Sequence, residues 1–406
     1  MPTAIVLFTR DLRVHDHPAL HAALQSADAV VPLFVLDDAV LRGPFAAPNR
    51  TSFLVDCLHD LRAALRQRGS DLVVARGDVV KEVAAVATAT GATEVHLSAD
   101  VSAHAQRREV RLRATGLTVT SHPGITIVPP DELRASGGSN YKVFTPYWRV
   151  WAAEPWRPTV PAPKTLRLPT GIRAGRIPAA TTLCPGERSP ALPRGGEERG
   201  RARMTTWLRS SLAAYEQHHD DLAADDTSRL SPWLHFGCIS PIELAEAAAG
   251  RPGGEAFVRQ LCWRDFHHQV TAAHPRIATD DYRPRGRRWL TGAEADDAFE
   301  TWRYGRTGVP LVDAAMHQLR HEGWVHNRAR LVAASYLTKT LGVDWRRGAS
   351  HYLHWLVDGD IVNNSANWQW VAGTGTDTRP NRVLNPFRQA GRHDPDGAYV
   401  AQHLSS

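Results

Sequence analysis

The stretch Asp358-Gly359-Asp360-Ile361-Val362-Asn363-Asn364-Ser365-Ala366-Asn367-Trp368-Gln369-Trp370 carries the densest chemistry in the chain. It combines two carboxylates, three asparagines and two tryptophans within thirteen residues. Glycine, asparagine and serine favour caps and turns over helix interiors, so a ligand explains such a run better than a core does. Carboxylates and amides hydrogen-bond the edge of a flat heterocycle, and tryptophans stack on its face. The stretch therefore predicts a ligand site, with a polar loop held by two tryptophans as the alternative.

The composition is that of a globular chain with two or three domains. With 406 residues, of which 43% are hydrophobic and 22% charged, the chain can bury an ample core. No apolar run approaches the ~20 residues of a membrane span, and the apolar run that ends at Phe8 is too short for a signal peptide. We therefore expect a cytoplasmic protein without a membrane span. The net charge of +6 is mild evidence for a polyanionic partner.

The four cysteines lie far apart. Cys57, Cys184, Cys238 and Cys262 include no Cys-x-x-Cys pair, so the sequence predicts neither a disulfide framework nor a zinc or iron–sulfur site. Widely spaced thiols fit a reducing cytoplasm. We expect no bound metal.

Residues 3–121 alternate between strand and helix patterns. Continuous apolar runs predict strands at 4–8, 29–36, 72–75, 94–97 and 117–120. Helical spacing recurs between them, as at Leu54, Leu58, Leu61 and Leu65. This alternation predicts a doubly wound parallel five-stranded sheet, so we expect an α/β domain over residues 1–130. No Gly-x-Gly-x-x-Gly motif follows the first strand, which argues against a conventional dinucleotide site there.

The chain changes character after residue 130. Ten prolines fall between residues 146 and 193, so we expect an irregular connector over residues 131–198. From there on the pattern is helical, with Pro310 at the start and Gly323 at the end of one helix. We expect an all-α domain over residues 199–406.

Two further segments carry ligand-binding chemistry. Tyr215 precedes Thr227-Ser228-Arg229-Leu230-Ser231-Pro232, whose hydroxyls and guanidinium at a helix start suit a pyrophosphate, although an ordinary capping segment has the same composition. On a helix, the side chains of Gln260, Trp263, Arg264 and His267 share one face. This mixture is neither clean core nor clean surface, so we expect it to border a pocket.

The chain resembles the cryptochrome/photolyase family, and within it the class I cyclobutane pyrimidine dimer photolyases. The resemblance extends from Thr9-Arg10-Asp11-Leu12-Arg13 to Asn385-Pro386. Its other specific motifs are Gly323-Trp324-Val325-His326-Asn327-Arg328-Ala329-Arg330, Asp344-Trp345-Arg346 and Gly373-Thr374-Gly375-Thr376-Asp377. The resemblance implies a monomeric carbon–carbon lyase that repairs UV-damaged DNA with light. Excited, reduced FAD gives an electron to a flipped-out cyclobutane dimer, the ring splits, and the electron returns.

The resemblance also implies a set of FAD-binding residues. They are Tyr215, Thr227, Ser228, Arg229, Leu230, Ser231, Phe257, Gln260, Trp263, Arg264, His267, Asn327, Arg330, Asp358, Gly359, Asp360 and Asn364. The family places the phosphates of FAD on the motif that residues 227–231 match in this chain. Asp358 would pair with Arg330, and Asp360 would accept a hydrogen bond from the edge of the flavin ring. Asn364 would face flavin N5, where a neutral carboxamide favours the fully reduced anionic flavin.

The DNA contacts implied by the resemblance include departures from the family pattern. The implied residues are Gln260, Trp263, Asn327, Arg328, Leu331, Trp370 and Gln389. Trp263 and Trp370 would stack on the flipped dimer, and Arg328 would hold phosphates, together with the basic run 283–288. Gln260 stands where the family has Glu and cannot donate a proton to the dimer. His219 replaces a DNA-contacting Arg, and Leu331 replaces a Met.

The resemblance further implies an electron relay of three tryptophans. Trp368 and Trp345 match its inner and middle members. Trp289 is the choice for the surface member, and Trp302 is the alternative. Each of these residues is also explained as core packing.

Two rival functions share these motifs. The (6-4) photolyases also carry Gln at position 260, but they need a second histidine where this chain has Asn327. A photosensory cryptochrome without repair activity is disfavoured by Asn364, Asn327 and Trp370, and the chain leaves no room for the extended tail of signalling cryptochromes. Residues 100–106 lack the Asn-Glu pair that contacts folate in some members. An antenna pigment of the 8-hydroxy-5-deazaflavin type is therefore favoured over methenyltetrahydrofolate, and the absence of a pigment stays open.

Overall fold

The computed structural model describes residues 2–135, 137 and 140–404. A five-stranded parallel sheet forms the core of the first part of the chain, with the strand order β3-β2-β1-β4-β5. The strands are β1 (Thr3–Phe8), β2 (Ala29–Asp37), β3 (Val73–Gly77), β4 (Glu94–Ser98) and β5 (Thr118–His122). The predicted doubly wound α/β fold is confirmed.

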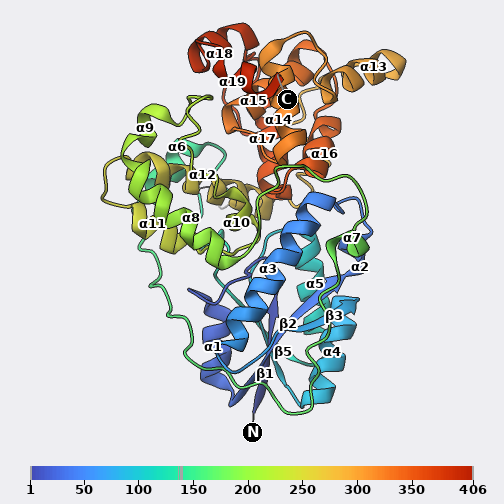
Figure 1. Ribbon diagram of the computed structural model, residues 1–406, viewed down its shortest axis with the longest axis vertical. Coiled ribbons are helices and arrows are strands. Elements are labelled where there is room, and N and C mark those ends of the chain that lie inside the picture. Colours follow the sequence, from blue (N-terminus) through green and yellow to red (C-terminus); the bar gives the residue numbers. More distant parts are fainter. Residues whose placement is uncertain (1, 136, 138–139, 405–406) are drawn as a thin grey trace.

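Helices cover both faces of this sheet, as Figure 1 shows in blue and cyan. They are α1 (Pro18–Ser26), α2 (Asp38–Leu41), α3 (Pro48–Arg66), α4 (Val79–Thr90) and α5 (Ala103–Arg113). All six residues of β1 are buried, as expected for a parallel strand that is covered on both faces. In α3, Leu58, Leu61 and Leu65 are buried against the sheet, whereas Leu54 is only partly buried.

The proline-rich connector is bonded to the α/β part along much of its length. It contains two helices, α6 (Phe144–Trp151) and α7 (Ala180–Leu183). The amide of Leu166 donates to the carbonyl of Arg68 at 2.7 Å, and the amide of Val74 donates to the carbonyl of Ala174 at 2.8 Å. The expectation of an irregular segment is therefore only partly right, because this segment has short helices and fixed backbone partners.

The remainder of the described chain is helical, and in Figure 1 it lies above the sheet. Its helices are α8 (Glu197–Ser210), α9 (Tyr215–His218), α10 (Ser231–His235), α11 (Pro241–Ala248), α12 (Gly254–Ala273), α13 (Gly292–Arg303), α14 (Pro310–Glu322), α15 (Asn327–Ser335), α16 (Trp345–Trp355), α17 (Ile361–Ala372), α18 (Pro386–His393) and α19 (Ala398–Leu404). A 3₁₀ turn spans Leu212–Ala214, and a π-helical turn spans Tyr336–Thr340. As predicted, Pro310 begins α14 and Gly323 ends it in the left-handed conformation, with φ 65°.

Most of the polar stretch 358–370 is helical and not a loop, because residues 361–370 belong to α17. The side chain of Asp360 caps its first turn by accepting from the amide of Val362 at 2.8 Å. Gly373 ends the helix with φ 81°. Between these caps, α17 packs against α12, α15 and α16, so tertiary contacts stabilise a sequence of poor helix propensity.

A buried ion pair joins the sheet to the helical part. Arg10, in the loop that follows β1, donates to Asp360 at 2.8 Å and lies 3.5 Å from Asp100, which follows β4. The side chains of both carboxylates are only 5% exposed. Burial alone would raise the pKa of Asp360, but the guanidinium of Arg10 holds that pKa well below its ordinary value.

Other contacts cross the same boundary. The amide of Leu12 donates to the carbonyl of Phe236 at 3.1 Å, and the Sγ atoms of Cys57 and Cys238 lie 3.3 Å apart as free thiols. Two of the cysteines that are far apart in the sequence are therefore neighbours across this boundary. Within the described ranges, no helix is both long and apolar enough to span a membrane, and no cluster of His, Cys, Asp or Glu is arranged to hold a metal ion.

Replacing Arg10 tests how much this buried pair stabilises the fold. Near pH 7, Arg10→Met should lower the free energy of unfolding by about 3–5 kcal/mol, because two buried carboxylates lose their counter-charge. The depressed pKa of Asp360 contributes stability that is present above pH 3.8, its ordinary value, and is lost as the pH falls through the folded pKa. The difference in the free energy of unfolding between the variant and the parent protein should therefore become smaller below pH 3.8. Urea denaturation followed by tryptophan fluorescence measures both effects.

Arg42 provides the matched control. It pairs with Asp38 at 3.5 Å on the surface, so Arg42→Met should change stability by about 0.5 kcal/mol or less. If Arg10→Met costs no more than this control, the pair does not join the two parts of the chain.

Candidate functional site

One cavity gathers most of the residues predicted from the sequence. It encloses about 620 Å³, within the ~300–1,000 Å³ that is typical of cofactor sites. Its walls come from residues 227–231, from α12, α15 and α16, and from residues 358–360 together with α17. We call it the inner cavity.

The inner cavity is lined by every residue predicted to bind FAD and by most of those predicted to contact DNA. The predicted residues on its wall are Tyr215, Thr227, Ser228, Arg229, Leu230, Ser231, Phe257, Gln260, Trp263, Arg264, His267, Asn327, Arg328, Arg330, Leu331, Asp358, Gly359, Asp360, Asn364, Trp368 and Trp370. Three predicted site residues, Trp345, Trp289 and Gln389, lie outside this lining. Segments far apart in the sequence therefore converge on one space.

Sequence reasoning gave no cofactor or DNA role to several lining residues. These are Asp220, Leu234, His235, Leu261, Trp324, Ala334, Tyr352, Leu356, Asn363, Asn367, Val371 and Arg382, and His219 was noted only as a departure from the family pattern. The spacing of Asn363, Asn367 and Trp370 at i, i+4 and i+7 places them on one helix face, which was a usable signal. Tyr352 and Arg382 had no comparable signal.

The pair between Arg330 and Asp358 fixes one wall. The guanidinium donates to both carboxylate oxygens, at 3.1 and 2.9 Å, so the predicted pairing is confirmed. Arg330 also donates to the carbonyl of Val325 at 2.7 Å. Arg50, from α3, supports the turn at Gly359. A Cβ on that residue would lie 2.6 Å from the Arg50 Nη1 atom and 2.9 Å from the carbonyl oxygen of Leu356, so the turn favours glycine.

Asp360 and the residues around it form a polar wall. Its carboxylate accepts from Asn363 Nδ2 at 3.0 Å as well as from Arg10, and its depressed pKa keeps it ionised. His267 Nδ1 lies 3.0 Å from Asn363 Oδ1, and burial lowers the pKa of His267 to about 4. His267 is therefore neutral near pH 7 and offers one donor and one acceptor.

Buried polar atoms without partners point to a bound polar ligand. The hydroxyl of Thr227 and the Nδ1 atom of His235 are buried on the wall and have no hydrogen-bond partner in the protein. Each such atom costs about 1–3 kcal/mol unless something bonds it. The donor and acceptor set of this wall fits the edge and phosphates of FAD.

The sequence predicts that the guanidinium of Arg229 binds a phosphate, but in the structure this group is paired with carboxylates. Its guanidinium already donates to Asp225 at 2.5 Å and to Glu322 at 2.6 Å, and it lies 4.2 Å above the ring of Trp324. The positive φ of 50° at Arg229 turns the backbone sharply here. The charge of Arg229 is thus paired, and the unpartnered hydroxyl in this segment belongs to Thr227.

Asn364 and Trp368 lie where α17 crosses α16. The Nδ2 atom of Asn364 donates to the carbonyl of Ala349 at 3.0 Å, which leaves its carbonyl oxygen for a ligand. The ring of Trp368 packs directly on Gly348, because a Cβ there would lie only 2.2 Å from the ring. Its centroid is 4.9 Å from Tyr352 and 6.0 Å from Trp302.

The predicted relay residues differ in their exposure. Trp345 is fully buried, and its Nε1 atom donates to Asp281 at 2.9 Å. Trp289 is partly buried against the hydrophobic cluster that contains Trp345, and it lies under the guanidinium of Arg287. Trp302 is fully buried, so the alternative that placed it at the surface is wrong.

Two aromatic rings on the cavity wall each have one face covered by the protein. Phe144 stacks on Trp263 with a centroid distance of 3.7 Å and an interplanar angle of 5°. The guanidinium of Arg382 lies 4.7 Å above the ring of Trp370. Both rings also line the inner cavity, and Gln260 is exposed on the same helix as Trp263.

Charged groups complete this side of the cavity. Arg328 pairs with Asp220, whose pKa it lowers against the opposing effect of burial, and His219 adjoins that carboxylate at 4.0 Å. The basic run 283–288 is irregular, and the amide of Arg283 donates to the carbonyl of Thr374 at 2.7 Å. Both side chains of the Arg328–Asp220 pair are partly open to solvent, 25% and 29% exposed, so a phosphate can reach Arg328 and replace Asp220 as its partner.

Comparisons with known proteins agree with this geometry. The protein-family model described as DNA photolyase matches residues 4–164. The family model described as FAD binding domain of DNA photolyase matches residues 257–406. The deoxyribodipyrimidine photo-lyase of Streptomyces griseus is 56% identical, over 98% of this chain and 89% of its own length.

Solved structures give the same result. A bacterial class III photolyase from Agrobacterium tumefaciens has a TM-score of 0.92 at 30% identity, over 100% of this chain and 87% of its own. An archaeal photolyase from Sulfolobus tokodaii, solved with two FAD molecules, has a TM-score of 0.88 at 28% identity. The match covers 99% of this chain and 90% of the archaeal chain. The chain therefore belongs to the DNA photolyase family and carries the FAD-binding domain of that family.

Proposed function

We propose that this chain binds FAD in the inner cavity and uses light to split cyclobutane pyrimidine dimers in DNA. The observation that carries the proposal is the pairing of a polar, partly unsatisfied inner wall with two half-covered aromatic rings, Trp263 and Trp370. The wall suits a flavin nucleotide, and the rings suit two pyrimidines that have left the base stack. The protein acts as a monomer in the cytoplasm in this proposal.

The protein groups divide the work between the flavin and the DNA. Arg330 with Asp358, and Asp360 with Asn363, hold the flavin in the inner cavity. Bound FAD, when reduced and excited by light, supplies the electron that opens the cyclobutane ring. Gln260 donates a hydrogen bond to a pyrimidine carbonyl, and Arg328 exchanges Asp220 for a DNA phosphate.

The fit of the site with dimer repair separates it from its rivals. Asn327, on the cavity wall, has no acidic proton to give, so it lacks the chemistry that a (6-4) photolyase needs at this position. A photosensory protein has no need for two aromatic rings in the cavity that can stack on bases. The antenna pigment of the 8-hydroxy-5-deazaflavin type stays a prediction.

The central experiment illuminates pre-reduced protein with oligonucleotides that carry either a cyclobutane dimer or a (6-4) lesion. We expect repair of the dimer only, and preferential binding to damaged DNA that persists at raised salt, since phosphate contacts alone are screened. Gln260→Glu should raise the repair yield per photon because Glu can share a proton with the dimer. Binding should change by no more than ~1 kcal/mol, about one hydrogen bond.

Each alternative has its own outcome in this assay. Repair of the (6-4) lesion would replace the proposed substrate. Repair of neither lesion by parent or variant would leave photosensing as the better account.

Trp368 is proposed as the entry point for electrons that reduce the flavin. Trp368→Phe should abolish light-driven reduction of oxidised FAD by external thiol and spare repair by chemically reduced protein. The relay feeds the flavin and does not lie between flavin and substrate. The absorbance of oxidised FAD under blue light measures the first effect, and dimer repair measures the second.

Trp148→Phe, on α6, is the matched control and should leave both measurements unchanged. Unchanged photoreduction in Trp368→Phe would remove this residue from the relay.

A further inference from the structure

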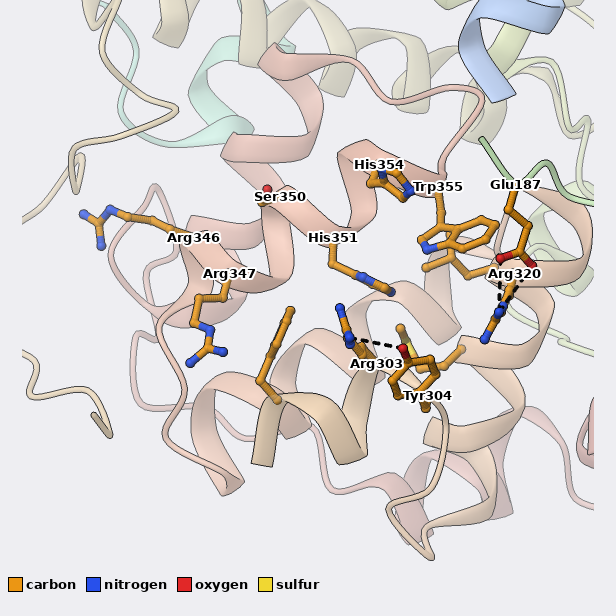
Figure 2. A pocket seen from close by; sticks show the side chains of 13 residues that line it. Glu187, Arg303, Tyr304, Arg320, Arg346, Arg347, Ser350, His351, His354 and Trp355 are labelled. Carbon is orange, nitrogen blue, oxygen red and sulfur yellow. Dashed lines mark hydrogen bonds and ion pairs between the residues drawn. The ribbon is translucent and has the colours of Figure 1, made fainter. Parts of the chain in front are cut away.

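The helix α16 separates the inner cavity from a second cavity on its other side. Tyr352 and Leu356 face the inner cavity. Arg347, His351 and His354, at i, i+4 and i+7, line the second cavity, which encloses about 700 Å³. Figure 2 shows this space between α16 and the residues of α13 and α14. We call it the outer cavity, and the proposed repair chemistry makes no use of it.

The lining of the outer cavity is strongly basic. Four arginines line it, Arg303, Arg320, Arg346 and Arg347, from three helices. Among the described residues that line it, Glu187 is the single carboxylate. Each of these arginines pairs with a carboxylate, so an anion that enters the cavity exchanges places with one of those partners.

All four arginines lie over aromatic rings, and Arg346 is 4.8 Å from the ring centre of Trp345. Arg303 lies 4.7 Å from the ring centre of Tyr304, Arg347 lies 4.5 Å from that of Phe299, and Arg320 lies 5.5 Å from that of Trp355. Stacking restrains a guanidinium and leaves its N–H edge available for donation. These arginines are therefore partly preorganised to bind an anion.

Each of the four arginines already has a carboxylate partner. Arg303 pairs with Glu300 at 2.6 Å, and Arg346 pairs with Asp281 at 2.8 Å. The partners of Arg320 and Arg347 are the most exposed. Glu187 accepts from Arg320 at 3.2 Å with 61% of its side chain exposed, and Asp296 pairs with Arg347 with 67% exposed. Exposed ion pairs contribute about 0–1 kcal/mol, so a phosphate can displace these carboxylates at small cost. Bidentate arginine–phosphate bonds are stronger than such pairs.

The deeper part of the outer cavity suits a flat ring. Met316 and Leu319 of α14 are buried and apolar, and Phe299 and Trp355 add aromatic surface. Burial lowers the pKa of His351 to about 3, so His351 is neutral near pH 7 and offers hydrogen bonds without charge. A cationic rim around an aromatic interior matches a planar heterocycle that carries a phosphate.

We propose that the outer cavity binds a phosphorylated planar heterocycle of the mononucleotide class. The phosphate bonds Arg303 and Arg320, and the ring lies against Trp355 and His351. The volume of about 700 Å³ exceeds what a bare phosphate needs. This site is distinct from the inner cavity, because the two linings share no residue.

The test uses AMP, adenosine and inorganic phosphate as probes, added to the full chain saturated with FAD so that the inner cavity is filled. Isothermal titration measures each affinity. We expect AMP to bind about tenfold or more tightly than either fragment, and its affinity to fall as salt is raised. Equal binding of AMP and phosphate would overturn the assignment of a ring pocket, and no binding of AMP would overturn the site.

Two substitutions in the outer cavity should act in opposite directions. Arg320→Gln should weaken AMP binding about tenfold because it removes a charged donor to the phosphate. Glu187→Gln should strengthen it, because it removes the carboxylate that competes for Arg320. A merely structural role for this pair predicts the same direction for both variants.

Arg276→Gln is the matched control. Arg276 is 80% exposed, pairs with Asp280 and lines neither cavity, so its replacement should leave AMP binding unchanged. Circular dichroism and the thermal midpoint of each variant exclude misfolding as the cause of lost binding. Equal loss in Arg276→Gln and Arg320→Gln would show general charge attraction and overturn the proposal.

Discussion

The ion pair of Arg10 with Asp360 is the constraint on which the rest of the structure depends. Arg10 stands at the carboxyl end of the central strand β1, which is where open parallel sheets present their functional groups. Asp360 is at once the cap of α17 and a wall of the inner cavity. A buried carboxylate is tolerated only with a partner and good geometry, so the sheet and the helix must meet in one orientation.

That orientation explains why the α/β part belongs to the site although none of its residues lines the inner cavity in the described structure. Arg10 fixes the start of α17, and Arg50 of α3 fixes the turn before it at Gly359. Arg13 adds bonds to the carbonyls of Gly237 and Gly124. The helix that presents Asn364 and Trp368 is therefore held from the sheet side as well as by its helical neighbours.

The sheet could be predicted from the sequence because parallel strands buried on both faces are continuous apolar runs, as at residues 4–8. The helical state of α17 could not be predicted from propensity, because it rests on the Asp360 cap and on packing. The family resemblance predicted which residues line the cavity, but not which of its charged side chains are paired with one another. Arg229 and Arg328 bond Glu322 and Asp220, which lie 93 and 108 positions away, so no local pattern could reveal that these cations are paired.

The two faces of α16 differ in how much of their role the sequence motif at the start of the helix predicts. Asp344-Trp345-Arg346 marks the start of the helix in the family pattern. It predicts no role for Arg347, which follows directly, or for His351 and His354, which lie one and two turns beyond Arg347. In a single sequence these residues have the composition of a solvated helix face. Their meaning depends on Arg303 and Arg320, which come from other helices. The ring of His351 lies 5.6 Å from Trp302, which in turn lies 6.0 Å from Trp368 on the inner wall. The inner cavity has a buried carboxylate in its wall and the outer cavity has partly exposed arginines, and the two share one helix and a continuous set of ring contacts between them.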